Sequence, residues 1–467
     1  MRDVVILGST GSIGVQALEV IASNPQQFRV VAISSAGSNP ELVIAQAKQF
    51  KVSHVGVVNN ADVVRNALPG VSVVDGANAS TEIAAINCDV VVNGITGSIG
   101  VQALEVIASN PQQFRVVAIS SAGSNPELVI AQAKQFKVSH VGVVNNADVV
   151  RNALPGVSVV DGANASTEMA AINCDVVING ITGSIGLGPT LAALDAGNTL
   201  ALANKESLVA AGDLVMSRAR EHQIIPVDSE HSAIFQSALA GKNSEIKKIV
   251  LTASGGAFRD RTNLDGITVE DALKHPTWSM GAVVTINSAT LVNKGLEIIE
   301  AHYLFGLPYS SIEAVIHPQS VVHSLVEFND GSTIAQASPP NMKGAIAYAM
   351  NWPDRLSNST TPIDWSIPHA WNFAPIDPKQ FPSIELARHC GEKGGGLPAI
   401  FNAANEVAVA AFIAKKLEFK SIVEVIASVV KDLEKDSPKT LRDLADVSAL
   451  EDDARTRAQA HLLRLAP

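Results

Sequence analysis

The chain has 467 residues, of which 47% are hydrophobic and 17% charged, with a net charge of −11 and a pI near 5.5. A chain of this length is too long to fold around one hydrophobic core, so two to three domains are expected. An acidic chain argues against nucleic acid or an anionic membrane as the main partner, and no apolar run approaches the roughly 18 residues that span a bilayer.

The N-terminal part of the chain carries a tandem duplication. Residues 10–100 recur as 96–186, an offset of 86 (96 − 10), and only two of the 91 positions differ. Two copies are too few for a repeat solenoid, which needs about three units or more. We therefore interpret the repeat as a duplication inside an ordinary domain, and removing one copy leaves 381 residues (467 − 86).

Each copy alternates short strands with amphipathic helices, which predicts a parallel sheet covered by helices. Residues 1–227 are therefore expected to form a Rossmann-like α/β domain. In the first copy we expect strands at 3–8, 29–34, 54–58, 71–74 and 89–93, and helices that begin near Ser12, Pro40, Ala61 and Ala79.

This sheet can form in two ways. If the first copy forms it, about 86 residues loop out, at a closure cost of roughly 4 kcal/mol. If the second copy forms it, residues 89–92 become the first strand and residues 1–86 extend from the N-terminus. The first copy is synthesised first, and N-terminal units tend to fold first, which favours the first arrangement. The second arrangement avoids the free-energy cost of closing the loop, so we expect the second copy to form the sheet. The copy left out lacks a complete sheet and is an aggregation risk.

A glycine-rich turn follows the first expected strand and opens a helix. It reads Gly8-Ser9-Thr10-Gly11-Ser12-Ile13-Gly14, and Gly94 to Gly100 repeats its position. Such glycines let the backbone approach a pyrophosphate at a helix N-terminus, so the turn predicts dinucleotide binding, although a plain tight turn is the alternative. The second strand ends in Ser34-Ser35-Ala36-Gly37-Ser38-Asn39, without an acid, which favours NADP over NAD. No Arg or Lys stands there for a 2′-phosphate either.

Two carboxylates follow a buried-looking strand, Ile224 to Val227. Asp228 and Glu230 are two residues apart, so in an extended chain both side chains face one way. Paired carboxylates suit Mg²⁺ or Mn²⁺. A solvated acidic loop explains the same tripeptide equally well.

A second polar group lies on a predicted helix further along the chain. Asn293 and Glu297 are four residues apart and share one helix face. Glu297 could complete a metal site while Ser288, Asn293 and Lys294 contact a phosphate. The alternative is an ordinary helix turn with Lys294 and Glu297 as a surface ion pair.

Three further positions are candidates for substrate contacts. Ser254 follows an apolar strand and precedes a glycine pair, so it could donate to a phosphate, or it could stand in a simple turn. His275 begins a loop, His275 to Gly281, that has the composition of a lid, although a lone histidine is more often structural. Lys205 follows the strand Thr199 to Ala203, where α/β sites collect residues. We interpret His317 and His323 as structural.

Two dehydrogenase classes are excluded or disfavoured by single residues. A short-chain dehydrogenase needs Tyr-x-x-x-Lys, and no tyrosine of this chain has a lysine four positions later. A semialdehyde dehydrogenase needs a catalytic cysteine, and Cys390, near a helical C-terminal region, is a poor candidate.

Together these segments resemble the 1-deoxy-D-xylulose 5-phosphate reductoisomerase family over nearly the whole chain, once one copy is set aside. The matching segments are Gly8 to Gly14, Ala203 to Ser207, Pro226 to Gln236, Leu251 to Arg259, His275 to Gly281, Ser288 to Glu297, Ile316 to Ser324 and Asn402 to Glu406. Members of that family use NADPH and a divalent metal in non-mevalonate isoprenoid synthesis. They rearrange the substrate, reduce it to 2-C-methyl-D-erythritol 4-phosphate, and are usually homodimers.

The resemblance also implies residue roles. The implied metal ligands are Asp228, Glu230 and Glu297, for Mg²⁺, Mn²⁺ or Co²⁺. The implied substrate contacts are Lys205, Ser229, Glu230, Ser254, His275, Ser288, Asn293, Lys294 and Glu297, of which Lys205, Glu230 and His275 are the implied catalytic residues, with Trp278 shielding the site. The implied cofactor contacts are Thr10, Gly11, Ser12, Ile13, Gly37, Ser38, Asn39, Asn204, Glu206 and Gly281, or, in the second copy, Thr96, Gly97, Ser98, Ile99, Gly123, Ser124 and Asn125.

The chain departs from the family at several positions. Ser38 and Val283 stand where the family commonly has lysine, and Asn287 stands where it usually has aspartate. The two missing lysines should weaken attraction for the cofactor phosphates. The duplication is the larger departure, because it leaves open a catalytically impaired form that only binds cofactor.

The remaining sequence completes the expected domain organisation. We expect a catalytic domain at 228–351 with a flap at 254–282, a proline-containing linker at 352–382, and a helical domain at 383–467. Within the last, helices are expected at 397–415, 419–433 and 449–464. Three cysteines do not make a disulfide framework, and a strand-like start leaves no leader, so we expect a bacterial cytoplasmic protein.

Overall fold

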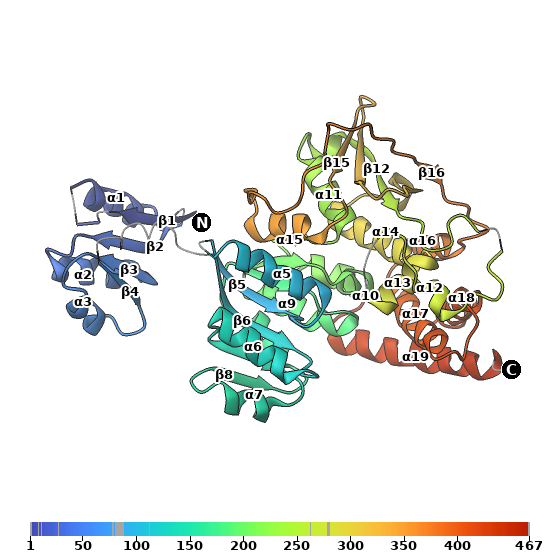
Figure 1. Ribbon diagram of the computed structural model, residues 1–467, viewed down its shortest axis with the longest axis horizontal. Helices are drawn as coiled ribbons and strands as arrows, with labels where there is room; N and C mark the ends of the chain where they lie inside the picture. The colour runs from blue at the N-terminus through green and yellow to red at the C-terminus, as the bar shows by residue number, and fades with distance from the viewer. Residues whose placement is uncertain are drawn as a thin grey trace. The chain divides into compact units, whose positions relative to one another are not determined.

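The computed structural model describes residues 2–7, 9–10, 12–26, 28–76, 79, 88–111, 113–261, 263–277 and 281–465. The chain forms two compact units (Figure 1). The first comprises residues 1–88 with 110–115, and the second comprises 89–109 with 116–467.

The first unit is a four-stranded parallel sheet made by the first copy. Its strands lie in the order β1-β2-β3-β4, so β1 is an edge strand paired with β2. Ile33, Val43, Val55 and Val64 are fully buried in its core. The elements are β1 (Arg2–Leu7), α1 (Ser12–Ser23), β2 (Phe28–Ser35), α2 (Pro40–Phe50), β3 (His54–Val57), α3 (Ala61–Ala67) and β4 (Ser72–Asp75). The helix expected near Ala79 falls largely outside the described residues.

The second unit contains a seven-stranded sheet in the order β11-β10-β9-β5-β6-β7-β8. Its central strand β5 holds residues 89–92, so the expectation that the second copy builds this sheet is confirmed. The elements are β5 (Cys88–Asn93), α5 (Ser98–Ser109), β6 (Phe114–Ser121), α6 (Pro126–Phe136), β7 (His140–Val143), α7 (Ala147–Ala153), β8 (Ser158–Asp161), α8 (Ala165–Ala170), β9 (Val176–Asn179), η1 (Ser184–Gly186), α9 (Leu187–Asp195), β10 (Thr199–Leu202), α10 (Lys205–Met216) and β11 (Ile224–Pro226).

Strand β5 is held in the middle of this sheet by burial and by one polar side chain. It pairs in parallel with β9, Val90 opposite Val176, and its valines are fully buried, as expected of a strand covered on both faces. Asn93 at its end accepts a 2.7 Å hydrogen bond from the Ser120 hydroxyl and donates to the Ser166 carbonyl. The next residue, Gly94, has φ +83°, and a Cβ there would lie 2.9 Å from the Gly180 carbonyl group, so only glycine fits.

A five-stranded mixed sheet forms the central part of the second unit, in the order β15-β14-β12-β13-β16. Strand β12 pairs in parallel with β13 and antiparallel with β14. The elements are α11 (Ser229–Ala238), η2 (Asn243–Glu245), β12 (Ile246–Ala253), α12 (Val269–Ala272), α13 (Ala282–Ala289), α14 (Val292–Phe305), η3 (Tyr309–Ser311), β13 (Ile312–Ile316), β14 (Val322–Phe328), β15 (Thr333–Ala337), α15 (Met342–Asn351) and β16 (Ala374–Pro375).

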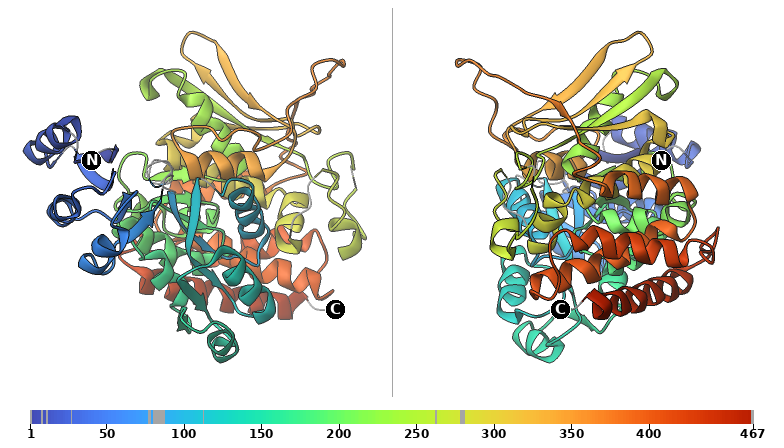
Figure 2. Two further views of the ribbon diagram at one scale, coloured as in Figure 1. Left: turned by 60° about the vertical axis from the view of Figure 1, so that its left-hand side comes forward. Right: turned by 90° about the vertical axis from the view of Figure 1, so that its right-hand side faces the viewer.

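Four helices end the chain and pack side by side (orange to red in Figure 2). They are α16 (Ser383–Lys393), α17 (Leu397–Ile413), α18 (Ser421–Leu433) and α19 (Leu444–Leu465), which confirms the three expected C-terminal helices with shifted ends. The buried Phe401, Ile422 and Val425 belong to the core that also receives α14. None of the helices in the described part of the chain has both the length and the apolar composition needed to cross a membrane.

Candidate active site

The candidate site is a cavity of about 480 Å³ in the second unit. The turn before α5, the loops after β10, β11 and β12, and helices α13 to α15 contribute to its walls. The predicted residues that line it are Gly97, Ser98, Ile99, Lys205, Glu206, Asp228, Ser229, Glu230, Ser254, His275, Gly281, Ser288, Asn293, Lys294 and Glu297. Trp278, the expected shield, lies outside the described residues.

Three carboxylates converge in this cavity. Asp228 is the N-cap of α11, Glu230 lies in its first turn, and Glu297 lies on α14. One oxygen from each lies within 4.8 Å of the others, and Glu297 is 1% exposed. The expectation of a fully extended segment is wrong, because α11 begins at Ser229, yet an N-cap and the first turn after it still bring both carboxylates to one place.

Two lysines are paired with these carboxylates. Lys205 Nζ lies 2.5 Å from Asp228 Oδ2 and 3.1 Å from Glu297 Oε1. Lys294 Nζ lies 2.8 Å from Glu230 Oε1, contacts Glu297, and donates to the Thr252 carbonyl at 2.5 Å. Burial disfavours the charged lysines, but the carboxylates outweigh it and raise the pKa of both.

The balance of charge leaves room for a cation. Three carboxylates face two ammonium groups, and burial together with the Glu230 charge raises the pKa of Glu297. Burial also opposes ionisation of Asp228, but Lys205 outweighs it and holds the Asp228 pKa below its usual range. Clustered hard oxygen donors with surplus negative charge fit Mg²⁺ or Mn²⁺.

Ser254 and His275 bring further hydrogen-bond donors to the cavity. His275 Nδ1 accepts from the Thr277 backbone N–H at 3.1 Å, so in the neutral ring Nε2 carries the proton and donates to the Ser254 hydroxyl at 2.9 Å. The Gly256 N–H also donates to that hydroxyl, which leaves the Ser254 O–H to donate outward. Burial, with the Arg259 charge nearby, lowers the pKa of His275 to about 4. Ser288, Asn293 and Lys294 complete a set suited to an anion.

The glycine turn of the second copy contributes Gly97, Ser98 and Ile99 to the cavity, at the start of α5. Thr96, Gly123, Ser124 and Asn125 do not line it, so their expected cofactor contacts have no support from this cavity. Thr96 Oγ1 lies 3.3 Å from Ser121 Oγ, which also accepts from the Gly123 N–H, and Asn125 caps α6.

The first copy repeats this geometry in the other unit. Thr10 Oγ1 lies 2.7 Å from Ser35 Oγ, Gly37 N–H donates to Ser35 Oγ, and Asn39 caps α2. Ser38 belongs to the same loop. Gly11 and the side chains of Ser12 and Ile13 fall outside the described parts of the structure. Within the described residues, this unit has no counterpart of β9, β10 and β11 beside its edge strand β1.

Asn204, an expected cofactor contact, hydrogen-bonds a neighbouring turn through its side chain. It caps α10 and is 1% exposed, and its amide donates to the Ile181 and Gly183 carbonyls at 2.7 and 2.9 Å. It therefore fixes the third Thr-Gly-Ser-Ile-Gly turn and does not line the cavity. Glu206, which does line it, has a raised pKa because it is buried.

Sequence reasoning missed two buried residues and misread a third. His231 and Glu300 lie directly behind the carboxylates, and each follows a metal candidate by three residues, which is the signal that could have found them. His323 was expected to be structural, but it lines the cavity at 5% exposure, held by Ser338. His317 is structural as expected, because its ring accepts backbone N–H groups of the following strand.

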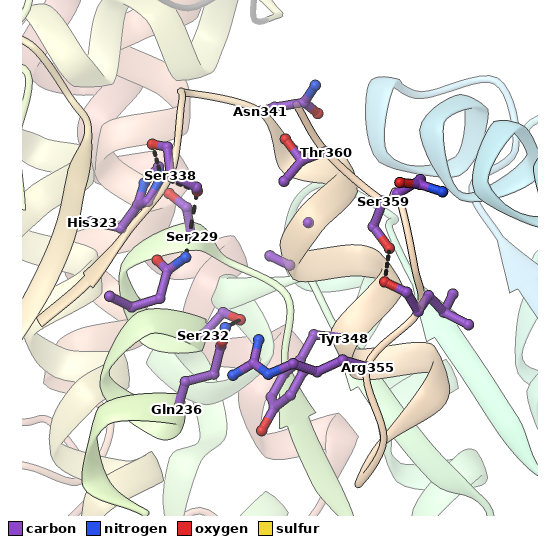
Figure 3. Close-up of a pocket in the computed structure, with 15 residues that line it drawn as sticks. Ser229, Ser232, Gln236, His323, Ser338, Asn341, Tyr348, Arg355, Ser359 and Thr360 are labelled. Carbon is purple, nitrogen blue, oxygen red and sulfur yellow. Dashed lines mark hydrogen bonds between the residues drawn. The ribbon is translucent and has the colours of Figure 1, made fainter. Parts of the chain in front are cut away.

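A smaller cavity of about 210 Å³ adjoins the site and shares Ser229, His323 and Asn341 with it (Figure 3). In it, the Gln236 amide donates to Ser232, and the Arg355 guanidinium lies 4.7 Å from the Tyr348 ring centre. Ser229, His323 and Asn341 therefore stand in the wall between the two cavities.

Family models match most of the chain. The model described as 1-deoxy-D-xylulose 5-phosphate reductoisomerase matches twice, at residues 4–97 and 90–212, in agreement with the duplication. Models of the C-terminal domains of the same enzyme match residues 224–305 and 337–457.

Relatives and solved structures agree with these matches. The 1-deoxy-D-xylulose 5-phosphate reductoisomerase of Streptomyces coelicolor is 51% identical and that of Kitasatospora griseola also 51%, over 80% and 79% of this chain and 92% and 98% of theirs. The Zymomonas mobilis enzyme in complex with NADPH has a TM-score of 0.75 at 38% identity. A DOX-P reductoisomerase with NADPH, fosmidomycin and magnesium has 0.77 at 36%. Both structures cover 81% of this chain and 99% of their own.

Proposed function

Because this chain belongs to the 1-deoxy-D-xylulose 5-phosphate reductoisomerase family, we propose that it converts 1-deoxy-D-xylulose 5-phosphate to 2-C-methyl-D-erythritol 4-phosphate, with NADPH and a divalent cation. The observation that carries the proposal is the convergence of Asp228, Glu230 and Glu297 in a cavity that also holds a glycine turn and an anion-type donor set. Mg²⁺ or Mn²⁺ is the expected cation, and Co²⁺ is an expected substitute.

The carboxylates would hold the cation, and the lysines would serve the substrate. When bound, the cation would supply Lewis acidity and a template for the substrate oxygens. Lys205 would then stand beside both Asp228 and the substrate hydroxyls, with Ser229 next to it. Lys294 keeps its charge through Glu230 and Glu297, so it can attract the phosphate while fixing both ligands.

The phosphate would be bound by Ser254 and the donors near it. Ser254 donates outward because its own acceptor capacity is used by His275 and Gly256. With Ser288 and Asn293, it would orient the reacting carbons through binding energy from a remote group. The flap at 254–282 would exclude water from the reaction.

NADPH would bind at the second copy, where Gly97, Ser98 and Ile99 face the cavity. Its nicotinamide supplies the hydride. Glu206 and Gly281 line the same cavity and would contact this cofactor. The first copy, Thr10 to Asn39, repeats the turn outside the unit that holds the carboxylates.

We also propose a homodimer in the bacterial cytoplasm. The segment between α15 and α16 exposes Trp365, Ile367 and Phe373 at 70%, 55% and 46%, an apolar surface that a second copy would cover. Light scattering should give twice the chain mass of 48.7 kDa. The free thiols of Cys174 and Cys390 suit a reducing compartment, which cell fractionation checks.

Oxidation of NADPH in the presence of 1-deoxy-D-xylulose 5-phosphate tests the main proposal. Turnover should stop with a chelator and return with added Mn²⁺ or Mg²⁺. NADPH binding without turnover under all metal conditions would instead support the cofactor-binding form without catalysis.

A further inference from the structure

Behind the carboxylate cluster lies a second layer of buried polar side chains, His231 and Glu300. His231 follows Asp228 by three residues on α11, and Glu300 follows Glu297 by three residues on α14. Both are 0% exposed and neither lines the cavity. A substrate in the cavity therefore meets neither, and any effect on the reaction passes through the residues in front of them.

The His231 ring bridges the two helices that carry the metal candidates. Its Nε2 lies 2.9 Å from the backbone carbonyl oxygen of Glu297, and because a carbonyl only accepts, Nε2 carries the N–H. Its Nδ1 lies 3.3 Å from Glu300 Oε2 and 3.9 Å from Asp228 Oδ2. The ring also stacks on Phe305, at 12° between planes, which fixes its tilt.

These contacts restrain the geometry that a cation needs. Asp228 and Glu297 come from different helices, and buried carboxylates repel each other, so their spacing depends on what ties α11 to α14. His231 donates from Nε2 to the Glu297 carbonyl, and on the other side of the ring its Nδ1 faces both Glu300 at 3.3 Å and Asp228 at 3.9 Å. Partners behind a metal ligand typically affect metal affinity about 10- to 100-fold.

We propose that His231 is a positioning residue for the metal site, held in place by Glu300, and that it sets the spacing between Asp228 and Glu297. The proposal rests on the proposed function, because it needs a cation at the three carboxylates. The alternative is that His231 is only a hydrogen-bonded residue of the core. Its loss would then change the stability of the protein without changing its affinity for a metal.

Two substitutions separate these possibilities. In His231→Gln, the amide nitrogen replaces Nε2 and can still donate to the Glu297 carbonyl. In His231→Phe, the ring still stacks on Phe305 but makes no hydrogen bond. Binding of Mn²⁺ to each full-length protein is measured by electron paramagnetic resonance, with NADPH affinity and the thermal unfolding midpoint measured on the same samples.

We expect His231→Phe to raise the Kd for Mn²⁺ about 10- to 100-fold, and His231→Gln to raise it less than about 3-fold. NADPH affinity should stay unchanged in both, and excess Mn²⁺ should restore much of the turnover of His231→Phe. Glu300→Leu should resemble His231→Phe, whereas Glu300→Gln, which can donate to Nδ1, should resemble the unchanged protein.

The measurements distinguish a failure of the positioning role of His231 from a failure of the metal site itself. Asp228→Asn should lose Mn²⁺ binding if the carboxylates hold the cation, whatever His231 does. If Asp228→Asn loses it and folded His231→Phe binds Mn²⁺ normally, the positioning role is overturned and the metal site stands. Two Mn²⁺ per chain, one of them lost in His231→Phe, would overturn it as well, because His231 would then be a ligand.

Discussion

At the scale of single residues, Glu297 connects the two lysines of the site. It contacts both Lys205 and Lys294, and Asn293 donates to the same carboxylate. It is 1% exposed on a helix whose neighbouring positions are also buried. A change at this residue therefore alters the charge of the whole cluster without reaching the glycine turn.

Glu297→Gln should abolish most metal-dependent turnover while leaving NADPH affinity nearly intact. The substitution keeps the size of the side chain but removes one of the three proposed charged ligands, and a loss of several kcal/mol of charge stabilisation lowers kcat on the order of 100-fold or more. Steady-state kinetics at varied Mn²⁺, with NADPH titrated by fluorescence, checks this. Equal loss of turnover and NADPH binding would contradict the assignment of Glu297 to the metal site and not to the cofactor site.

His275 should make folding stability depend on pH between about 4 and 6.5. Its folded pKa is about 4 because of burial and Arg259, below its ordinary value of 6.5. The stability that the neutral ring contributes is thus present above pH 6.5 and lost as pH falls toward 4. His275→Gln cannot titrate, so its unfolding free energy should fall less over this range in urea melts. Parallel curves for the two proteins would contradict the buried, neutral ring.

The residues that were predicted from the sequence follow from local spacing along one helix. The residues that were missed depend on contacts between segments far apart in the sequence. Glu297 and Asn293 were predicted from helical spacing, which is local. His231 and Glu300 were missed because their role needs α11 packed against α14, a contact that spacing does not encode. Asn204 was expected to contact the cofactor only through the resemblance, and in the structure its side-chain amide binds the backbone of a neighbouring turn.

At the scale of elements, the alternation of strands and helices was enough to predict the parallel sheet. Buried parallel strands are continuous apolar runs, such as Val90 to Val92, and turn residues mark their ends. The lengths of helices were less predictable. The last helix begins at Leu444, five residues earlier than expected.

The glycine turn allows a matched test of the two copies. Ser98→Asp places a negative charge at the start of α5, where it should repel the NADPH pyrophosphate. Even weak repulsion of about 1.4 kcal/mol raises the KM for NADPH about tenfold. Ser12→Asp makes the same change in the first copy and should leave the KM within about twofold. An effect of Ser12→Asp alone would assign the cofactor to the first copy.

At the scale of the whole molecule, the duplication poses a question that sequence identity alone does not answer. The two copies differ at only two of 91 positions, so local propensity is the same in both. What distinguishes them is the chain that follows: β10 and β11 come after the second copy and, next to its last strand β9, complete its sheet. The free-energy cost of closing a loop of about 86 residues led to the prediction that the second copy forms the sheet. That cost depends on how the whole chain connects the strands.

A chain that lacks residues 1–86 should therefore keep the activity of the full-length protein. It retains β5 and the complete seven-stranded sheet, together with all residues proposed to hold the metal, the phosphate and NADPH. We expect kcat and the KM for NADPH to change by less than about twofold, since no cavity-lining residue is removed. The open edge of β1 disappears with the first unit, so aggregation on heating should decrease, which light scattering measures. A truncated protein that is folded by circular dichroism but no longer binds NADPH would show that the first copy supplies the cofactor site.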